Sequence, residues 1–100
     1  EASVYALEHW SPQLDELAFL NVGTGIDLSI RELAESVARA TGFSGTIHWD
    51  TSKPDGTPKK QLDVSRLAKL GWRSKINLSV GLANTVAVFR AQLKQDIVRL

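Results

Sequence analysis

The fold class is decided by residues 18–49, which read AFLNVGTGIDLSIRELAESVARATGFSGTIHW. The short apolar run at residues 18–22 meets Gly23-Thr24-Gly25, a pattern that predicts a buried strand entering a tight turn. A second run, Thr46-Ile47-His48-Trp49, predicts another strand. Parallel neighbours need a crossover connection, which is right-handed in nearly all proteins. The stretch therefore predicts a βαβ unit with two short parallel strands.

The helix between these strands has clear boundary signals. Ser29-Ile30-Arg31-Glu32 is a capping box, in which the Ser29 hydroxyl accepts from a backbone N–H of the first turn while Glu32 reaches back to the cap. Gly42 is suited to the C-cap. Residues at helical spacing between these ends predict one buried stripe, made of Ile30, Leu33, Ala34, Val37, Ala38 and Thr41.

Three more helices are expected. Residues 2–10 predict a short helix that ends before Pro12. Asp63 is a plausible N-cap for a helix from Val64 to Leu70, which Gly71 would close, with Trp72 packing back as an apolar anchor. Asn77 is placed to cap a last helix, whose expected shared face is made of Leu78, Leu82, Val86, Phe89 and Leu93. We therefore expect a small α/β fold with three to four helices, forming one domain over residues 1–100.

Composition narrows the functional classes. The chain has 100 residues, 43% of them apolar, and a net charge of +1, which favours one globular domain without broad attraction to nucleic acid or anionic lipid. The absence of cysteine excludes disulfides, thiolate metal ligands and a cysteine nucleophile. With two separated histidines, we expect no metal site. The opening residues lack a signal-peptide pattern, so the expected compartment is the cytoplasm.

Two patterns superficially suggest cofactor chemistry. Gly23-Thr24-Gly25 follows a predicted strand, but the third position of a G-x-G-x-x-G motif is Leu28, so we interpret the glycines as a structural turn. Tyr5 and His9 lie one helical turn apart, as in a Y-x-x-x-K reductase pair, but a mostly neutral histidine poorly replaces the lysine ammonium. We expect no catalytic residue and no bound cofactor in this chain.

The most informative segment is Lys53-Pro54-Asp55-Gly56-Thr57-Pro58-Lys59-Lys60. Two prolines stiffen this loop, and it carries three ammonium groups and one carboxylate. Lysine suits phosphate, and a carboxylate accepts hydrogen bonds from sugar hydroxyls. Composition alone is equally compatible with a solvated surface loop.

Several segments, in this order, resemble the GDP-L-fucose synthase family, a branch of the extended short-chain dehydrogenase/reductases. They are Asn21-Val22-Gly23-Thr24-Gly25, Ser29-Ile30-Arg31-Glu32-Leu33-Ala34, residues 52–60, Leu62-Asp63-Val64-Ser65-Arg66-Leu67 and Leu70-Gly71-Trp72. The asparagine–glycine turn and the leucine–glycine–tryptophan segment are common in the superfamily. The proline-rich loop with its basic residues is more particular to this branch.

The resemblance implies the carboxy-terminal, substrate-binding part of an NADP-dependent enzyme. Such an enzyme converts GDP-4-keto-6-deoxy-mannose to GDP-L-fucose by epimerising two carbons and reducing the ketone. By the same resemblance Asp55 contacts the nucleotide sugar and Lys60 lines the same pocket, while Lys53 and Lys59 are candidates on charge alone. The amino-terminal Rossmann domain, with its NADP loop and catalytic residues, would lie outside this chain. We therefore expect this chain to be inactive and monomeric alone, and the whole enzyme to be a homodimer.

Two alternatives remain open. The chain fits the equivalent part of an enzyme acting on a UDP- or dTDP-sugar. It also fits a non-catalytic α/β interaction module, because it carries no cofactor motif. Nucleic-acid binding is disfavoured, because the basic residues are few and no aromatic residues are interleaved with them.

Overall fold

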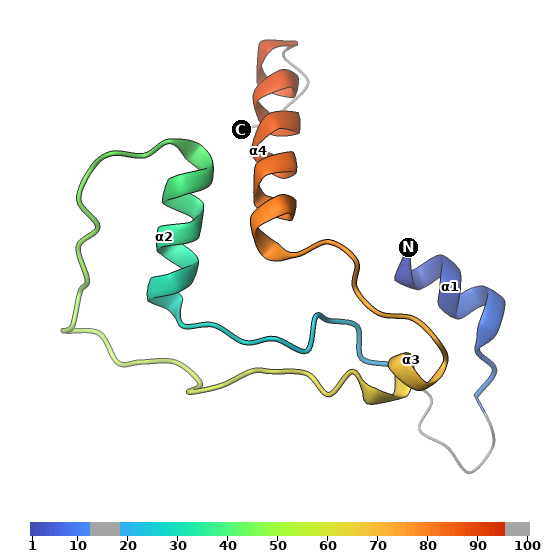
Figure 1. The fold of residues 1–100 in the computed structure, drawn as a ribbon. Coiled ribbons are helices and arrows are strands. Elements are labelled where there is room, and N and C mark those ends of the chain that lie inside the picture. Colours follow the sequence, from blue (N-terminus) through green and yellow to red (C-terminus); the bar gives the residue numbers. More distant parts are fainter. Residues whose placement is uncertain (13–18, 96–100) are drawn as a thin grey trace. The chain divides into compact units, whose positions relative to one another are not determined.

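The computed structural model of the chain describes residues 1–12 and 19–95. Their helices are α1 (Ala2–His9), α2 (Ile30–Thr41), α3 (Ser65–Lys69) and α4 (Leu78–Lys94) (Figure 1). The chain divides into two compact units. The first, Glu1–Asp27 with Thr57–Lys75, contains α1 and α3; the second contains α2 and α4. No helix in the described ranges is long and apolar enough to cross a membrane.

The predicted βαβ unit is not observed, because the described residues contain no strand. Residues 19–22 and 46–49 are both described, and neither segment forms a strand. Phe19 is 52% exposed and Val22 is 50% exposed, which corrects the prediction that the first run is buried. Ala18, at the start of that prediction, lies outside the described residues. Strand pairing is a non-local interaction, and two short segments cannot supply it without further strands beside them.

In the first unit, α1 is anchored at the end of α3. The Tyr5 hydroxyl donates a 2.6 Å hydrogen bond to the Leu70 carbonyl. The Tyr5 ring also stacks on His9, with centroids 4.0 Å apart. Tyr5 thus links α1 to the end of α3, and His9 stacks on its ring. The α1 helix itself was predicted to within one residue of its observed end at His9.

The short helix α3 holds the one buried hydrophobic side chain among the described residues, Leu67, which is 1% exposed. Asp63 was predicted as its N-cap, but the helix begins one residue later than expected, with Val64 at the N-cap position. Asp63 still accepts a hydrogen bond through Oδ1 from the Ser65 backbone N–H, at 2.9 Å. Beyond the helix, the Trp72 N–H donates to the Leu67 carbonyl at 3.2 Å, and the Trp72 side chain is half-buried.

In the second unit, both boundary predictions for α2 are confirmed. The Ser29 hydroxyl accepts from the Glu32 N–H at 3.1 Å, and the Glu32 carboxylate accepts from the Ser29 N–H at 2.7 Å. Gly42 is the left-handed C-cap, with φ 73°. The buried stripe is a wrong prediction: no residue of α2 is buried, and Ile30 is 70% exposed. A helix stripe is buried only when neighbouring elements cover its whole width, and among the described helices α2 contacts α4 alone.

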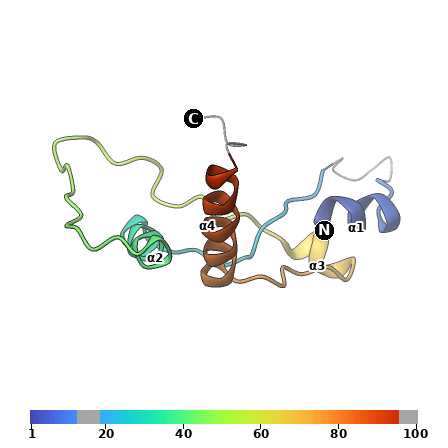
Figure 2. The ribbon, with the colours of Figure 1, turned by 90° about the horizontal axis from the view of Figure 1, so that it is seen from above.

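The last helix, α4, packs beside α2, and Figure 2 shows the pair with α2 seen end-on. Asn77 caps α4 as predicted, its side chain accepting from the Val80 N–H at 2.9 Å. The Arg90 guanidinium donates to the Thr41 carbonyl at the end of α2. On the predicted apolar face, Leu82 and Val86 are half-buried while Phe89 is 42% exposed. Contact with α2 therefore covers this face only in part.

Candidate functional site

The predicted binding loop begins with a tight side-chain turn. Oδ1 of Asp50 accepts from the Ser52 backbone N–H at 3.0 Å and from the Ser52 hydroxyl. These two hydrogen bonds, the hydroxyl one first, lower the pKa of Asp50 below its ordinary value, because both favour the charged carboxylate. The loop is therefore anchored immediately before Lys53.

All four predicted site residues are exposed. Lys53 and Asp55 lie in the second unit, whereas Lys59 and Lys60 lie in the first. Of the four, Lys59 lines a surface hollow, which is described next. The pocket role of Asp55, Lys60 and Lys53 stays a prediction.

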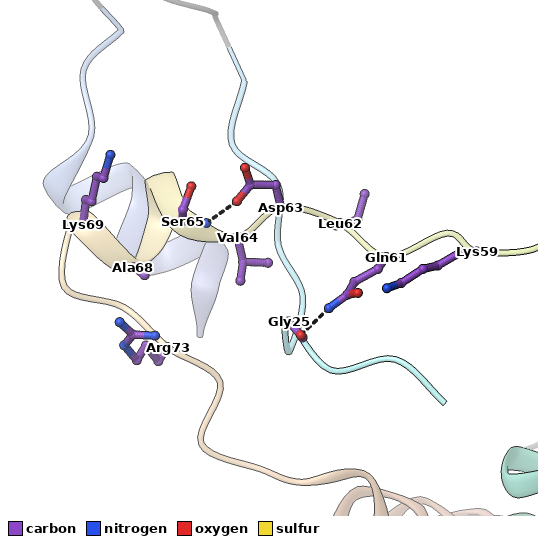
Figure 3. A pocket seen from close by; sticks show the side chains of 10 residues that line it. All are labelled: Gly25, Lys59, Gln61, Leu62, Asp63, Val64, Ser65, Ala68, Lys69 and Arg73. Carbon is purple, nitrogen blue, oxygen red and sulfur yellow. Dashed lines mark hydrogen bonds between the residues drawn. The ribbon is translucent and has the colours of Figure 1, made fainter. Parts of the chain in front are cut away.

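A hollow of about 870 Å³ lies beside α3 in the first unit. We call it the α3 hollow. Figure 3 shows the side chains that surround it, including Val64 and Ala68 from α3 and its N-cap. The complete set of lining residues is Gly25, Lys59, Gln61, Leu62, Asp63, Val64, Ser65, Ala68, Lys69 and Arg73. Its volume falls in the range of small-molecule sites, about 300–1,000 Å³.

The walls of the hollow are tied together by contacts between distant parts of the sequence. The Gln61 amide donates to the Gly25 carbonyl at 2.5 Å, and the Asn21 amide donates to the Asp63 carbonyl at 3.3 Å. Gly25 has φ 74°, and a Cβ added there would lie 3.2 Å from a Val64 methyl. The positive φ favours glycine here, and the nearby Val64 methyl leaves little room for a side chain. The predicted tight turn is observed, and it positions one wall of the hollow.

The rim of the α3 hollow is positively charged. Lys59, Lys69 and Arg73 contribute cations, and Asp63 contributes one carboxylate. The pKa of Asp63 is lowered, first by the hydrogen bond from the Ser65 backbone and to a smaller extent by the Ser65 hydroxyl and the charge of Lys69. Asp63 therefore stays ionised at neutral pH. The positive charge of Lys69 is partly balanced by the Asp63 carboxylate. Lys59 and Arg73 are the two other cations that line the hollow.

Sequence reasoning missed Lys69 and Arg73. Both flank Leu70-Gly71-Trp72, a segment interpreted only as a helix end and an apolar anchor. The sequence does show two cations four residues apart, one on each side of Gly71. That both line one hollow depends on the fold of α3. Within the described ranges, no cluster of histidine, cysteine, aspartate or glutamate could hold a metal ion.

The sequence is similar to a set of synthases of GDP-linked sugars. A GDP-L-fucose synthase of Escherichia coli K12 is 51% identical over 83 residues, covering 83% of this chain and 25% of the relative. One from Sinorhizobium fredii is 47% identical over 89 residues, covering 89% of this chain and 27% of the relative. A GDP-L-colitose synthase of Yersinia pseudotuberculosis is 35% identical over 77 residues, or 77% of this chain and 25% of the relative. No family model matches the chain.

These similarities place the chain among proteins related to nucleotide-sugar enzymes. More specifically, it is a homologue of the GDP-L-fucose synthases, and the resemblance seen in the sequence is confirmed. The chain spans about a quarter of the length of the curated relatives that it matches.

Proposed function

We propose that this chain forms the nucleotide-sugar-binding part of an NADP-dependent enzyme that makes GDP-L-fucose from a GDP-linked 4-keto-6-deoxy sugar. The observation that carries the proposal is the 51% identity to a GDP-L-fucose synthase over 83 residues, a stretch long enough to include most of this chain. On this proposal residues 1–100 act as one substrate-binding domain, located carboxy-terminal to a Rossmann domain.

The loop chemistry supports this role. Asp55 is exposed and offers a carboxylate to sugar or ribose hydroxyls. Lys60, Lys53 and Lys59 offer exposed ammonium groups to the diphosphate. The turn at Asp50 and Ser52 anchors one end of this loop, and Lys59 meets the α3 hollow at the other. These groups bind and orient the substrate; the residues that move protons and the NADP site would come from the rest of the protein.

The distribution of apolar residues supports the proposal that this chain is part of a longer protein. Leu67 is the single hydrophobic side chain buried among the described residues, while Leu7, Ile26 and Ile30 are at least 70% exposed. So little burial and so much exposed apolar side chain are expected when another part of a protein covers these residues. On our proposal the Rossmann domain of the longer protein covers it, and these helices pack with strands that lie outside this chain. The expected compartment is the cytoplasm.

The proposal is tested with the protein at its full natural length. We expect GDP-mannose to bind in a calorimetric titration, and NADPH to be consumed with GDP-4-keto-6-deoxy-mannose. The 100-residue chain alone should consume no NADPH, and should bind GDP-mannose far more weakly because part of the pocket wall is absent. Absence of binding to the full-length protein at millimolar GDP-mannose would remove the proposal.

A second candidate is an enzyme of the same kind acting on another nucleotide sugar. The similarity to a GDP-L-colitose synthase, 35% identical over 77 residues, favours it, since that relative is named for a different sugar. Parallel assays with GDP-, UDP- and dTDP-linked 4-keto sugars separate the two. Turnover with a UDP- or dTDP-sugar alone would favour the second candidate.

A further inference from the structure

We propose that the Asp55-Gly56 pair is a site of spontaneous backbone modification, at which the aspartate converts to isoaspartate through a cyclic succinimide. The pair is the one place in the sequence where glycine follows an aspartate or asparagine. Glycine favours this chemistry because a residue without a Cβ leaves its backbone nitrogen unhindered and rotates easily into the geometry of attack. The modification itself does not depend on the proposed function.

The reaction needs only these two residues and solvent water. The Gly56 backbone nitrogen attacks Cγ of the protonated Asp55 carboxyl group, and a nitrogen–carbon bond forms. The carboxyl hydroxyl leaves together with the proton of that nitrogen, as one water molecule. Water then opens the ring: attack at Cγ restores aspartate, whereas attack at the main-chain carbonyl carbon of Asp55 gives isoaspartate, whose backbone runs through Cβ and Cγ. One water is lost and one is gained, so the product has the mass of the original protein.

The structure leaves both reacting groups available. Asp55 and Gly56 are exposed and lie between α2 and α3, where residues 43–64 form no helix (Figure 1). Within the part of the chain that the structure describes, neither the Asp55 carboxylate nor the Gly56 N–H makes a hydrogen bond or ion pair. Nothing lies within 4 Å of a Cβ added at Gly56, so no other segment crowds this backbone. The pair can therefore reach the ring-closing geometry without breaking other contacts.

Two other aspartates have the opposite arrangement and serve as internal comparisons. Oδ1 of Asp50 accepts from the Ser52 N–H at 3.0 Å. Oδ1 of Asp63 accepts from the Ser65 N–H at 2.9 Å. These hydrogen bonds favour the ionised carboxylate and hold it against the residue after next. A β-branched residue follows each of the two, and its side chain hinders attack by its own nitrogen. We therefore expect modification at Asp55 and not at these two positions.

Isoaspartate would alter the loop that carries the proposed substrate contact, a consequence that rests on the proposed function. The modification adds a methylene to the backbone before Gly56 and attaches the carboxylate directly to Cα of residue 55. The carboxylate is then shorter by one bond and displaced from its original position. The modified fraction should therefore bind GDP-mannose about 10-fold more weakly, as expected for the loss of a hydrogen bond to a charged group.

The test incubates the full-length protein at physiological temperature and pH and follows isoaspartate by peptide mapping and by enzymatic methylation of isoaspartyl carboxylates. Isoaspartate at Asp55 should accumulate about 10-fold faster or more than at residues 50 and 63, and a fraction lighter by one water should mark the succinimide. Gly56→Val should slow the reaction about 10-fold or more, and the open space around residue 56 should leave the thermal midpoint unchanged. Thr57→Val is the matched control, because it places the same side chain one residue beyond the attacking nitrogen, and it should react like the wild type.

The outcomes are distinct. Equal isoaspartate at residues 50, 55 and 63, or an equal rate at residue 55 in the wild type and in Gly56→Val, would overturn the modification site. Calorimetric titration of the fresh and incubated proteins with GDP-mannose separates this result from the proposed function. If isoaspartate accumulates at residue 55 while the affinity does not fall, the modification stands and the Asp55 contact is wrong. If the fresh protein binds GDP-mannose and residue 55 stays aspartate, the proposed function stands and the modification is wrong.

Discussion

Gly71 sits at the point where α1 is anchored to α3, and replacing it with alanine tests that anchor. Its φ is 101°, a conformation that residues with a Cβ rarely adopt. An added Cβ would also lie 2.8 Å from the Tyr5 hydroxyl oxygen, which is closer than real Cβ contacts allow. That oxygen is not free to move, because it donates the 2.6 Å hydrogen bond to Leu70.

The expected cost has two separable parts. Holding alanine at positive φ costs about 1–2 kcal/mol. Displacing the Tyr5 hydroxyl sacrifices a hydrogen bond with a net value of about 1 kcal/mol. Gly71→Ala should therefore destabilise the protein by about 2–3 kcal/mol. In a Tyr5→Phe background the hydroxyl is absent and the nearest ring atom lies 3.9 Å from the added Cβ, so the strain alone remains, at about 1–2 kcal/mol.

A double-mutant cycle, measured by urea unfolding of the full-length protein, gives the coupling free energy between the Gly71→Ala and Tyr5→Phe substitutions directly. We expect Gly71→Ala to cost about 1 kcal/mol less in the Tyr5→Phe background. Gly42→Ala is the matched control, since Gly42 also has positive φ, 73°, but nothing lies within 4 Å of its added Cβ. Its cost should be the same in both backgrounds. Equal costs of Gly71→Ala with and without the Tyr5 hydroxyl would refute the proposed anchor.

Four further outcomes are expected. Ser29→Ala should lower stability by about 1 kcal/mol through loss of the α2 cap, whereas Ser79→Ala, on the exposed side of α4, should change it little; thermal melts compare them. The pKa of Glu32 is lowered, mainly by the Ser29 backbone N–H. Its contribution to stability is therefore present above pH 4.5 and lost as pH falls through the lower folded-state pKa. In thermal melts, Glu32→Gln should lose less stability than the wild type over that fall in pH. Asp55→Ala should raise KM about 10-fold with little change in kcat, and a fall in kcat alone would contradict a binding role. The isolated 100-residue chain should bind a hydrophobic dye more strongly, residue for residue, than the full-length protein, because more of its apolar surface is exposed.

Helix ends were predictable because their determinants are local. The caps at Ser29 and Asn77 and the left-handed glycine at Gly42 act through hydrogen bonds and dihedral preferences within a few residues. The strands were wrong for the opposite reason. Residues 46–49 favour extended backbone, but a strand exists only when a neighbour accepts its hydrogen bonds, and the sequence does not specify that neighbour.

In the candidate site, too, the local features could be predicted and those that depend on the fold could not. The charges and stiffness of residues 53–60 follow from composition, and Lys59 proved to line a hollow. The contribution of Arg73 could not be predicted, because it depends on the turn after α3 and on the contact between Val64 and the glycine turn at residue 25. Spacing along the sequence carries no information about such a meeting of distant segments.

The most direct test of nucleotide-sugar binding is a crystal structure of the full-length protein with GDP-mannose. We predict that the Asp55 carboxylate accepts a hydrogen bond from a sugar or ribose hydroxyl, and that the Lys60 ammonium donates one to a phosphate oxygen. A nucleotide sugar bound at full occupancy with neither Asp55 nor Lys60 in contact would contradict the proposed site.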